Sequence, residues 1–463
     1  MTKVQELFGK YIVRKEVVNE YEINRLPRFI AEYLISKFSN NGELSEDGIK
    51  KVSKFVNMHY PELKDKDKIL YNLMVNGNYT IIDEFKVEVD IKQGKKRLII
   101  PCLNIRDAEI LDNILEDNQD LLRSGMWGIA TLKYIGDNSN SKNTPILMTK
   151  FTPFQVGNVE LEDFISKRSE FTMDEWIDLI IKSIGLNPKV YSMDEKMLLL
   201  LRLVPLVEPN THIMELGPKA TGKTYLYRNI SYYTRIISGG RVGAATLFYN
   251  INTKVIGEIG IKDAVIFDEI DKLTFSNSEE VISKLKDYMV DGFFERGPKK
   301  AHATCSLVFT GNTDSYDISD IGSNLPEFMI DSALLDRING FIPGWKLPKI
   351  KSSSEHLASG YGIVADYFAE ILHKMRFENY NSFISEHIRL ENVTIRDEKS
   401  IKKVLSGLLK LLCVNRENYD RYELALCLDT AVSVRNNIRE ILNSITPDEF
   451  PKNEIKYSCK HTL

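Results

Sequence analysis

Cysteine and histidine are scarce in this chain, and their spacing argues against the common metal sites. The 463 residues include five cysteines, scattered and without a C-x-x-C pair, and seven histidines without an H-E-x-x-H spacing. Isolated cysteines of this kind are typical of proteins from reducing compartments. The sequence therefore indicates neither a zinc-binding domain nor a disulfide framework.

Long apolar runs are also missing. No uninterrupted apolar stretch approaches the roughly 20 residues that a membrane-spanning helix needs. The first residues, M-T-K-V-Q-E-L-F, lack the apolar core of a signal peptide. We therefore expect a soluble, cytoplasmic protein with no membrane partner.

A large excess of charge of one sign is absent too. Lysine and arginine total 61 and aspartate and glutamate 65, which gives a formal net charge of −4. The overall charge therefore does not indicate nucleic-acid binding, and any basic surface must be local. Hydrophobic residues make up 43% of the 463 positions. That length and composition predict two to four globular domains.

What the chain does contain is a phosphate-binding loop. Residues 217–224 have the sequence G-P-K-A-T-G-K-T, which fits the pattern G-x-x-x-x-G-K-[ST]. An apolar strand is predicted at 212–216 and a helix at 225–233. A strand, a glycine turn and a helix start surround a phosphate with backbone N–H groups. The expected nucleotide-binding residues are Gly217, Pro218, Lys219, Ala220, Thr221, Gly222, Lys223, Thr224 and Tyr225.

Four of these residues have expected roles. Gly217 and Gly222 permit the backbone angles that a phosphate cradle needs. Lys223 supplies a positive charge for the β- and γ-phosphates, and the Thr224 hydroxyl supplies a ligand for Mg²⁺. The alternative is a chance glycine turn before a helix. The predicted flanking strand and helix favour a nucleotide site with Mg²⁺.

Two adjacent acids follow a buried strand predicted at residues 263–268. In a parallel sheet this strand places Asp268 and Glu269 at the carboxyl edge, where ligands bind. Asp268 would hold the magnesium shell through water, and Glu269 would polarise the water that attacks the γ-phosphate. The alternative is a strand that happens to end in a charged helix cap.

Two further polar residues follow predicted elements downstream. Asn312 comes after a strand at 305–310 and could orient the attacking water, although G-N is also an ordinary turn sequence. A helix is predicted at 326–335, and its last residue begins the sequence L-D-R. Arg337 therefore follows this helix and directly precedes a strand predicted at 338–342. An exposed arginine there is also consistent with a simple surface salt bridge.

The chain divides into five predicted segments. Residues 1–155 form a mixed α+β domain, 156–211 a helical lead-in, 212–350 the nucleotide-binding core, 351–445 a helical lid and 446–463 a tail. From Tyr361 onward the pattern is helical, and Gly239-Gly240 is expected to turn the chain away from a strand at 235–238. Two groups of basic residues are candidate DNA contacts, with a solvated surface as the alternative: Lys95, Lys96 and Arg97, and Lys299 and Lys300.

The order of these motifs resembles that of the AAA+ ATPases. The resemblance implies an α/β fold: a P-loop domain with a parallel five-stranded sheet in the order 5-1-4-3-2, a C-terminal helical lid, and ATP as the nucleotide. On this resemblance Asn312 matches the sensor-1 position and Arg337 the arginine finger. Arg396 is the sensor-2 candidate, with Lys402 and Lys403 as competitors. The finger acts across a subunit boundary in this family, which implies a ring.

A second resemblance is narrower and covers residues 5 to 442. Blocks such as K-D-Y-M-V-D-G-F-F-E-R-G, I-D-S-A-L-L-D-R and V-L-S-G-L-L-K-L-L are similar to the Lon-related proteins of BREX phage-defence systems, the BrxL family. This implies an ATP-driven homo-oligomer, a hexameric ring or stacked rings, that engages double-stranded DNA in defence against phage. Other BREX proteins are candidate partners.

The resemblance departs at the C-terminus. Long members of the family continue into a Lon-protease-like domain, whereas 21 residues follow Leu442 here, so we expect no peptidase activity. One rival hypothesis is an AAA+ protein remodeller or unfoldase that works with a separate peptidase. Another is a monomeric GTPase-like switch, which the lack of an N-K-x-D motif weakens.

Overall fold

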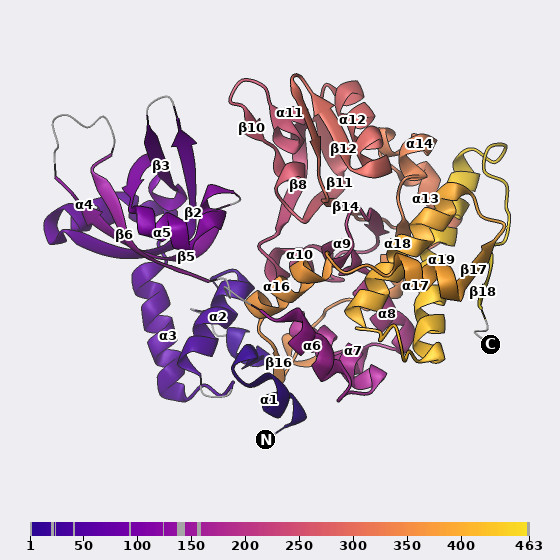
Figure 1. Ribbon diagram of the computed structural model, residues 1–463, viewed down its shortest axis with the longest axis horizontal. Helices are drawn as coiled ribbons and strands as arrows, with labels where there is room; N and C mark the ends of the chain where they lie inside the picture. Colours follow the sequence, from indigo (N-terminus) through magenta and orange to yellow (C-terminus); the bar gives the residue numbers. More distant parts are fainter. Residues whose placement is uncertain are drawn as a thin grey trace. The chain divides into compact units, whose positions relative to one another are not determined.

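The chain folds into two compact units (Figure 1). The computed structural model describes residues 2–19, 23, 25–39, 42–91, 94–123, 125–136, 144–154 and 159–460. The first unit comprises Met1–Val159 together with Ile363–Glu370, and the second Glu160–Gly362 together with Ile371–Leu463.

The first unit contains a closed five-stranded barrel. Its strands follow the order β2-β3-β4-β6-β5, and β5 pairs with β2 to close it. All neighbours are antiparallel except β4 and β6. Alternate residues such as Phe85, Val87 and Leu98 are buried in its core, as the period-two pattern requires. The strands are β2 (Asn78–Asp90), β3 (Lys95–Ile100), β4 (Ile105–Ile110), β5 (Met126–Tyr134) and β6 (Ile146–Pro153).

Among the described residues, four α-helices precede the barrel strands in the chain, and α5 lies between β4 and β5. Ser45 opens α3 by accepting a hydrogen bond from the backbone N–H of Gly48, and Gly77 ends α4 in the left-handed conformation. The elements are α1 (Lys3–Phe8), β1 (Ile12–Arg14), α2 (Arg28–Phe38), α3 (Glu46–His59), α4 (Lys66–Asn76) and α5 (Asp112–Asp117). The mixed α+β character predicted for the N-terminal region is confirmed.

The second unit is built on a parallel sheet of five strands. The strand order is β15-β7-β14-β11-β8 and every neighbouring pair is parallel. Counted along the chain, this is the predicted order 5-1-4-3-2. The strands are β7 (Ile213–Leu216), β8 (Thr234–Gly243), β11 (Ala264–Ser276), β14 (Ser306–Gly311) and β15 (Gly340–Pro343). All residues of β7 and β14 are buried, as expected for central strands.

Helices precede the sheet and connect its strands. Thr172 and Glu175 form a capping box at the start of α7. The lead-in helices are α6 (Leu161–Arg168), α7 (Met173–Ser183), α8 (Met193–Leu201) and α9 (Val204–Val207). The connecting elements are α10 (Lys223–Ile230), α11 (Ala244–Leu247), β9 (Tyr249–Asn250), β10 (Val255–Ile256), α12 (Ser278–Asp291), the hairpin β12 (Phe293–Arg296) with β13 (Lys299–His302), α13 (Ile318–Ile321), α14 (Ser332–Leu335) and α15 (Ser353–His356).

The C-terminal part is mainly helical. The long helices α18 and α19 run side by side, in orange and yellow in Figure 1. The prediction that everything after Tyr361 is helical is wrong in two respects: β16 is a strand at the start of this region, and β17 and β18 form an antiparallel pair. The elements are β16 (Tyr361–Ile363), α16 (Ala365–Met375), α17 (Asn381–His387), β17 (Ile388–Glu391), α18 (Ile395–Leu411), α19 (Arg421–Ile445) and β18 (Lys456–Cys459).

Two other predicted details are wrong. Gly239 and Gly240 do not end their strand, because β8 continues to Gly243 alongside the second half of β11. Both glycines have positive φ angles, 56° and 73°, which absorb the shift in strand register. The helix predicted at 326–335 is instead a short 3₁₀ turn followed by α14, whose first turn is capped by Asp331.

Among the residues that the structure describes, no helix combines the length and the apolar composition that a bilayer crossing requires.

Candidate nucleotide site

The phosphate loop connects β7 to α10, as its sequence predicts. Ala220 and Gly222 adopt positive φ angles of 67° and 80°, which turn successive peptide groups toward one concave side. Gly217 is required for a different reason from the one expected. Its φ is not positive, but a Cβ at this position would lie 2.6 Å from the carbonyl carbon of Gly344. The loop therefore depends on the close packing of two backbones at Gly217.

Lys223 is the first residue of α10 and folds over the loop. Its Nζ lies 2.8 Å from the carbonyl oxygen of Gly217 and 2.9 Å from that of Pro218. Burial lowers its pKa, because desolvation disfavours the ammonium form. No side chain caps the start of α10, so its first N–H groups can bind a phosphate. The loop geometry fits a nucleotide phosphate.

Asp268 is held by two hydroxyl groups. Its Oδ2 accepts a hydrogen bond from Thr224 Oγ1 at 2.9 Å, and its Oδ1 accepts one from Thr310 Oγ1 at 2.7 Å. Thr310 lies on β14, next to β11 in the sheet. Thr310 could not be identified from the sequence, because its proximity to Asp268 appears only once the strand order is known. The two threonines orient the carboxylate between the loop and the neighbouring strand.

Glu269 has an unusual backbone conformation. Its φ is 52°, in a region that residues other than glycine rarely adopt, where the register of β11 breaks after Asp268. Its carboxylate lies 3.2 Å from Lys272 Nζ, and its side chain is 41% exposed. The Glu269 carboxylate is therefore accessible to a ligand and to water.

Asn312 follows β14 directly and is exposed. The N–H of Gly217 donates a hydrogen bond to Gly311 at 3.3 Å, so the ends of β7 and β14 meet. The fold therefore brings the phosphate loop, Asp268 and Asn312 to one edge of the sheet, where ligands of parallel sheets bind.

Arg337 lies at the opposite edge of the same sheet. It precedes β15, whose first residue Gly340 pairs with Ile213, the first residue of β7. The phosphate loop begins after the last residue of β7. Four strand residues span roughly 13 Å. The arginine and the loop of one chain are thus separated by the length of the strand.

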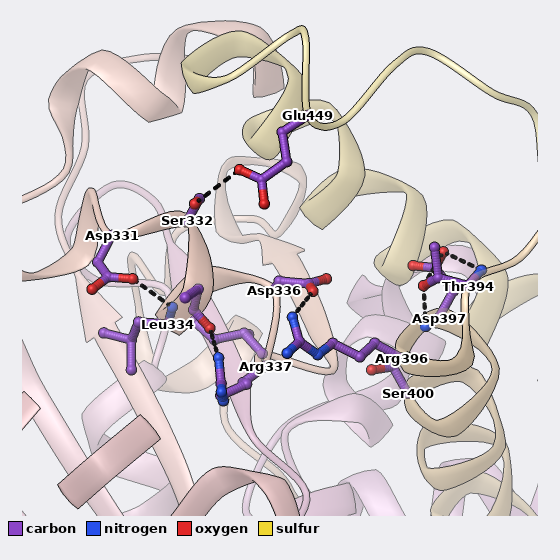
Figure 2. A network of polar contacts seen from close by, with 12 residues as sticks. Asp331, Ser332, Leu334, Asp336, Arg337, Thr394, Arg396, Asp397, Ser400 and Glu449 are labelled. Atoms are coloured by element: carbon purple, nitrogen blue, oxygen red, sulfur yellow. Dashed lines mark hydrogen bonds and ion pairs between the residues drawn. The ribbon is translucent and has the colours of Figure 1, made fainter. Parts of the chain in front are cut away.

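The Arg337 side chain is folded back on its own helix. Nη1 donates a hydrogen bond to the carbonyl of Ala333, and Nε is buried without a hydrogen-bond partner among the described residues (Figure 2). Burial and the neighbouring Arg396 guanidinium lower the Arg337 pKa. The Nε atom is therefore poorly satisfied in this rotamer.

Arg396 lies at the same edge, as Figure 2 shows. From the first turn of α18 it reaches Asp336, with Nη1 2.6 Å from Oδ2. Asp336 also accepts a hydrogen bond from the buried Arg435 on α19, at 2.6 Å from Nη2 to Oδ1. Arg435 in turn lies 2.8 Å from Asp397. Arg435 was missed, because nothing in its local sequence distinguishes it.

The two competing sensor-2 candidates point elsewhere. Lys402 forms an ion pair with Glu398 at 2.7 Å on its own helix. Lys403 is largely buried and donates a hydrogen bond to the carbonyl of Asn210, and this burial lowers its pKa to about 8. Of the three residues, Arg396 is the one whose guanidinium lies beside Arg337, with 49% of its side chain exposed.

The candidate DNA-contacting residues lie on two β-hairpins. Lys95, Lys96 and Arg97 are on β3 of the barrel, where Lys96 pairs with Asp112 and Arg97 with Asp90. Lys299 and Lys300 are on β13, where Lys300 pairs with Glu295. The partners are exposed or half-exposed acids, so a nucleic-acid phosphate would have to compete with them.

A magnesium ion would have two protein groups near it at the phosphate loop, Thr224 and Asp268. Within the described part of the chain, no cluster of three His, Cys, Asp or Glu side chains could hold a metal ion. Few protein ligands are normal for Mg²⁺ bound with a nucleotide, because phosphates and water complete its octahedral shell. The residues present therefore fit a nucleotide-bound Mg²⁺ and not a metal site made of protein ligands alone.

Together, these positions define a class of protein. A parallel sheet in the order 5-1-4-3-2, with a phosphate loop after its first strand and an acidic pair within its third, is the nucleotide-binding core of an AAA+ ATPase. Residues 146–456 match a family described as the Lon-like protease BrxL-like ATPase domain, and residues 6–134 match the BREX system Lon protease-like protein BrxL N-terminal family. The chain belongs to the BrxL family.

Two curated relatives show how far the likeness extends. A "Lon-like protease BrxL" of Escherichia coli O9:H4 (strain HS) is 31% identical over 98% of this chain and 66% of its own length. A protein of the same name from Bacillus cereus (strain H3081.97) is 33% identical over 97% of this chain and 67% of its own length. The chain thus spans about two thirds of the length of these relatives, and the match includes both the N-terminal and the ATPase regions.

Proposed function

We propose that the protein hydrolyses ATP as a homo-oligomeric ring, binds double-stranded DNA, and acts in BREX-type defence against phage. The observation that supports the ring is the position of Arg337. Asp268, Glu269 and the phosphate loop lie at one edge of the sheet, and Arg337 lies at the other. A guanidinium can assist hydrolysis only if it reaches a γ-phosphate. Head-to-tail contact between copies would bring the two edges together, and repetition of that contact closes a ring.

The hydrolysis step assigns work to the residues at the carboxyl edge. The loop amides and Lys223 would bind the phosphates, and Thr224 and Asp268 would hold Mg²⁺, which would neutralise charge on the phosphate oxygens. Glu269 takes a proton from the attacking water, which Asn312 orients. Arg337 of the neighbouring copy supplies a positive charge as negative charge redistributes on the γ-phosphate. Arg396 lies beside Arg337, which supports a role for it at the same subunit boundary.

The barrel of the first unit supports DNA binding. Five-stranded Greek-key barrels of the oligonucleotide-binding type contact nucleic acids through strands 2 and 3 and through the loop between strands 1 and 2. Lys95, Lys96 and Arg97 occupy the second strand of this barrel, next to the turn from the first. Contact through such residues would be electrostatic and independent of base sequence.

The decisive experiment combines imaging with an activity measurement. Electron microscopy of the protein with a non-hydrolysable ATP analogue and duplex DNA should show closed rings with density for DNA. Duplex DNA should also stimulate the ATPase rate. Monomers at micromolar protein concentration in the presence of the ATP analogue and duplex DNA would contradict the ring. Rings whose ATPase rate does not change when duplex DNA is added would contradict the DNA assignment.

The same assay separates the rival function. If unfolded protein stimulates ATP hydrolysis and duplex DNA does not, the chain is a protein remodeller that works with a separate peptidase. We expect no peptidase activity from this chain, and incubation with casein and ATP checks it: casein fragments would contradict that expectation.

A further inference from the structure

We infer that Arg202 is a positioning residue for nucleotide binding: it fixes the phosphate loop from behind by bridging the buried carboxylate of Glu215 and the carbonyl of Thr221. This inference rests on the proposed nucleotide site. The hydrogen bonds of Arg202 go to the Glu215 carboxylate and to the backbone carbonyl of Thr221. Its effect would come through the backbone of the loop.

The geometry joins three parts of the fold. Arg202 follows α8, Glu215 lies on β7, and Thr221 lies in the phosphate loop. Nε and Nη2 lie 2.8 and 2.6 Å from the two oxygens of the Glu215 carboxylate, and Nη1 lies 3.0 Å from the Thr221 carbonyl oxygen. Arg202 is 0% exposed and Glu215 1%. The planar fork of a guanidinium can form these bonds in fixed directions, whereas an ammonium cannot.

A phosphate loop needs donors behind it for a simple reason. Its N–H groups must face the phosphate, so several of its carbonyl groups face the protein and need hydrogen bonds there. The carbonyl of Ala220 accepts one from the N–H of Ile350 at 2.7 Å. Those of Gly217 and Pro218 accept bonds from Lys223, a side chain that a bound nucleotide would attract away. The hydrogen bond from Arg202 to the Thr221 carbonyl does not involve Lys223. It can therefore persist when Lys223 turns toward a bound nucleotide.

A contribution to folding stability alone does not explain why Arg202 and Glu215 form a buried ion pair. Replacing a buried ion pair with apolar residues of similar volume is often neutral or stabilising. The Glu215 carboxylate directs the Arg202 guanidinium, and the guanidinium directs the Thr221 peptide group. A role in positioning therefore predicts a loss of nucleotide affinity without a matching loss of folding.

The test measures binding of ATP and ADP by calorimetry in the full chain. Arg202→Met combined with Glu215→Met removes both charges and keeps apolar volume. We expect the Kd to rise about 10- to 100-fold for ATP and ADP alike, because the loop binds the phosphates that both share. In steady-state kinetics KM for ATP should rise more than kcat falls. A Kd within about twofold of wild type in a folded double variant overturns the inference.

Two further variants complete the design. Arg202→Lys preserves the charge but cannot hold Glu215 and Thr221 together, so its Kd should rise by a smaller factor; an unchanged Kd overturns the inference even if the double variant fails to fold. The control removes another ion pair of the same unit, the buried Lys410 and the partly buried Glu208, which lie 2.8 Å apart. Lys410→Met with Glu208→Met should leave the Kd unchanged. An equal rise in this control overturns the inference by showing that any buried pair has the same effect.

The same calorimetric titrations include the wild-type protein and Lys223→Ala, which test the nucleotide site itself. If wild type binds no ATP, the proposed nucleotide site is wrong. If wild type binds ATP and the Arg202 variants bind it equally well, only the role of Arg202 is wrong.

Discussion

Arg396, in the first turn of α18, forms an ion pair with Asp336, the residue directly before Arg337, at 2.6 Å between Nη1 and Oδ2. The buried Arg435 donates hydrogen bonds to both the backbone carbonyl and the carboxylate of Asp336. These bonds hold in place the residue that precedes Arg337. This arrangement connects the C-terminal helices to the chain segment that presents Arg337. A movement of α18 would therefore change the position of Arg337.

Arg337→Ala should bind ATP as wild type does but hydrolyse it slowly. Lys223 and Thr224 are intact in this variant, whereas trans-acting arginines contribute ~10³–10⁵ to the rate. A surface salt bridge at the same position would contribute only ~0–1 kcal/mol to stability and nothing to the rate. Steady-state ATPase measurements and calorimetry separate these two roles.

Mixing variants tests whether Arg337 acts in trans. Rings that combine Arg337→Ala with Glu269→Gln subunits contain some interfaces with both an intact base and an intact arginine. These mixtures should regain activity that neither parent has. Mixed rings demonstrated by mass spectrometry that stay as inactive as both parents would show that Arg337 does not act across the boundary.

Lys223→Ala should abolish measurable ATP binding, because it removes the charge that the loop directs at the β- and γ-phosphates. Calorimetry with ATP and Mg²⁺ measures the effect. Lys189→Ala is the matched control, since Lys189 is an exposed lysine of the same unit that does not belong to the loop. Undiminished affinity in Lys223→Ala would contradict the site assignment.

Glu269→Gln should keep ATP binding and slow hydrolysis by about 10²–10⁴-fold, the usual contribution of a general base. Gln cannot accept the proton of the attacking water, but it preserves the size of the side chain. The exposed Glu279, in the first turn of α12, provides a control through Glu279→Gln. Turnover of Glu269→Gln at the wild-type rate would show that another group is the base.

Charge reversal on the barrel hairpin should weaken DNA binding. Lys95→Glu with Lys96→Glu removes phosphate contacts, so affinity for duplex DNA should fall and its dependence on salt should become shallower. Lys50→Glu with Lys54→Glu makes the same charge change on exposed positions of α3 and should have a smaller effect. Fluorescence anisotropy across a salt series measures both quantities. An unchanged affinity and salt slope in the hairpin variant would remove this hairpin from the DNA site.

Asp366→Asn should change the pH dependence of stability in the first unit. Burial raises the pKa of Asp366 to about 7, and Glu32 adds to the effect while Lys15 opposes it. A raised pKa stabilises the folded state below the unfolded value near 4, and this contribution is lost as the pH rises toward 7. Between pH 5 and 7 wild type should therefore lose about 2–3 kcal/mol relative to Asp366→Asn.

Denaturant unfolding of the full chain at several pH values measures this difference. Lys15 faces the same site, but its pKa of about 8 keeps it charged throughout this range. Asp117→Asn, which alters an exposed carboxylate of the same unit, should follow the wild-type pH profile. Parallel profiles for wild type and Asp366→Asn would contradict the raised pKa.

The sequence by itself determined the local parts of the nucleotide core. The phosphate loop, the apolar strand before Asp268 and the G-N after β14 are short patterns whose geometry follows from nearby residues. From these patterns and the family resemblance, the parallel sheet order and the class of the protein were predicted correctly. The continuation of β8 past Gly239 and the pairing of β17 with β18 were not, because partner strands distant in sequence stabilise them.

Only the tertiary structure decided which side chains meet. Thr310 lies 42 residues from Asp268 in the chain, Arg396 60 residues from Asp336 and Arg202 19 residues from Thr221. No periodicity or motif predicts these pairings, since such a contact depends on how strands and helices pack. Packing also decided that the Arg337 guanidinium bonds to the carbonyl of Ala333 and lies beside Arg396.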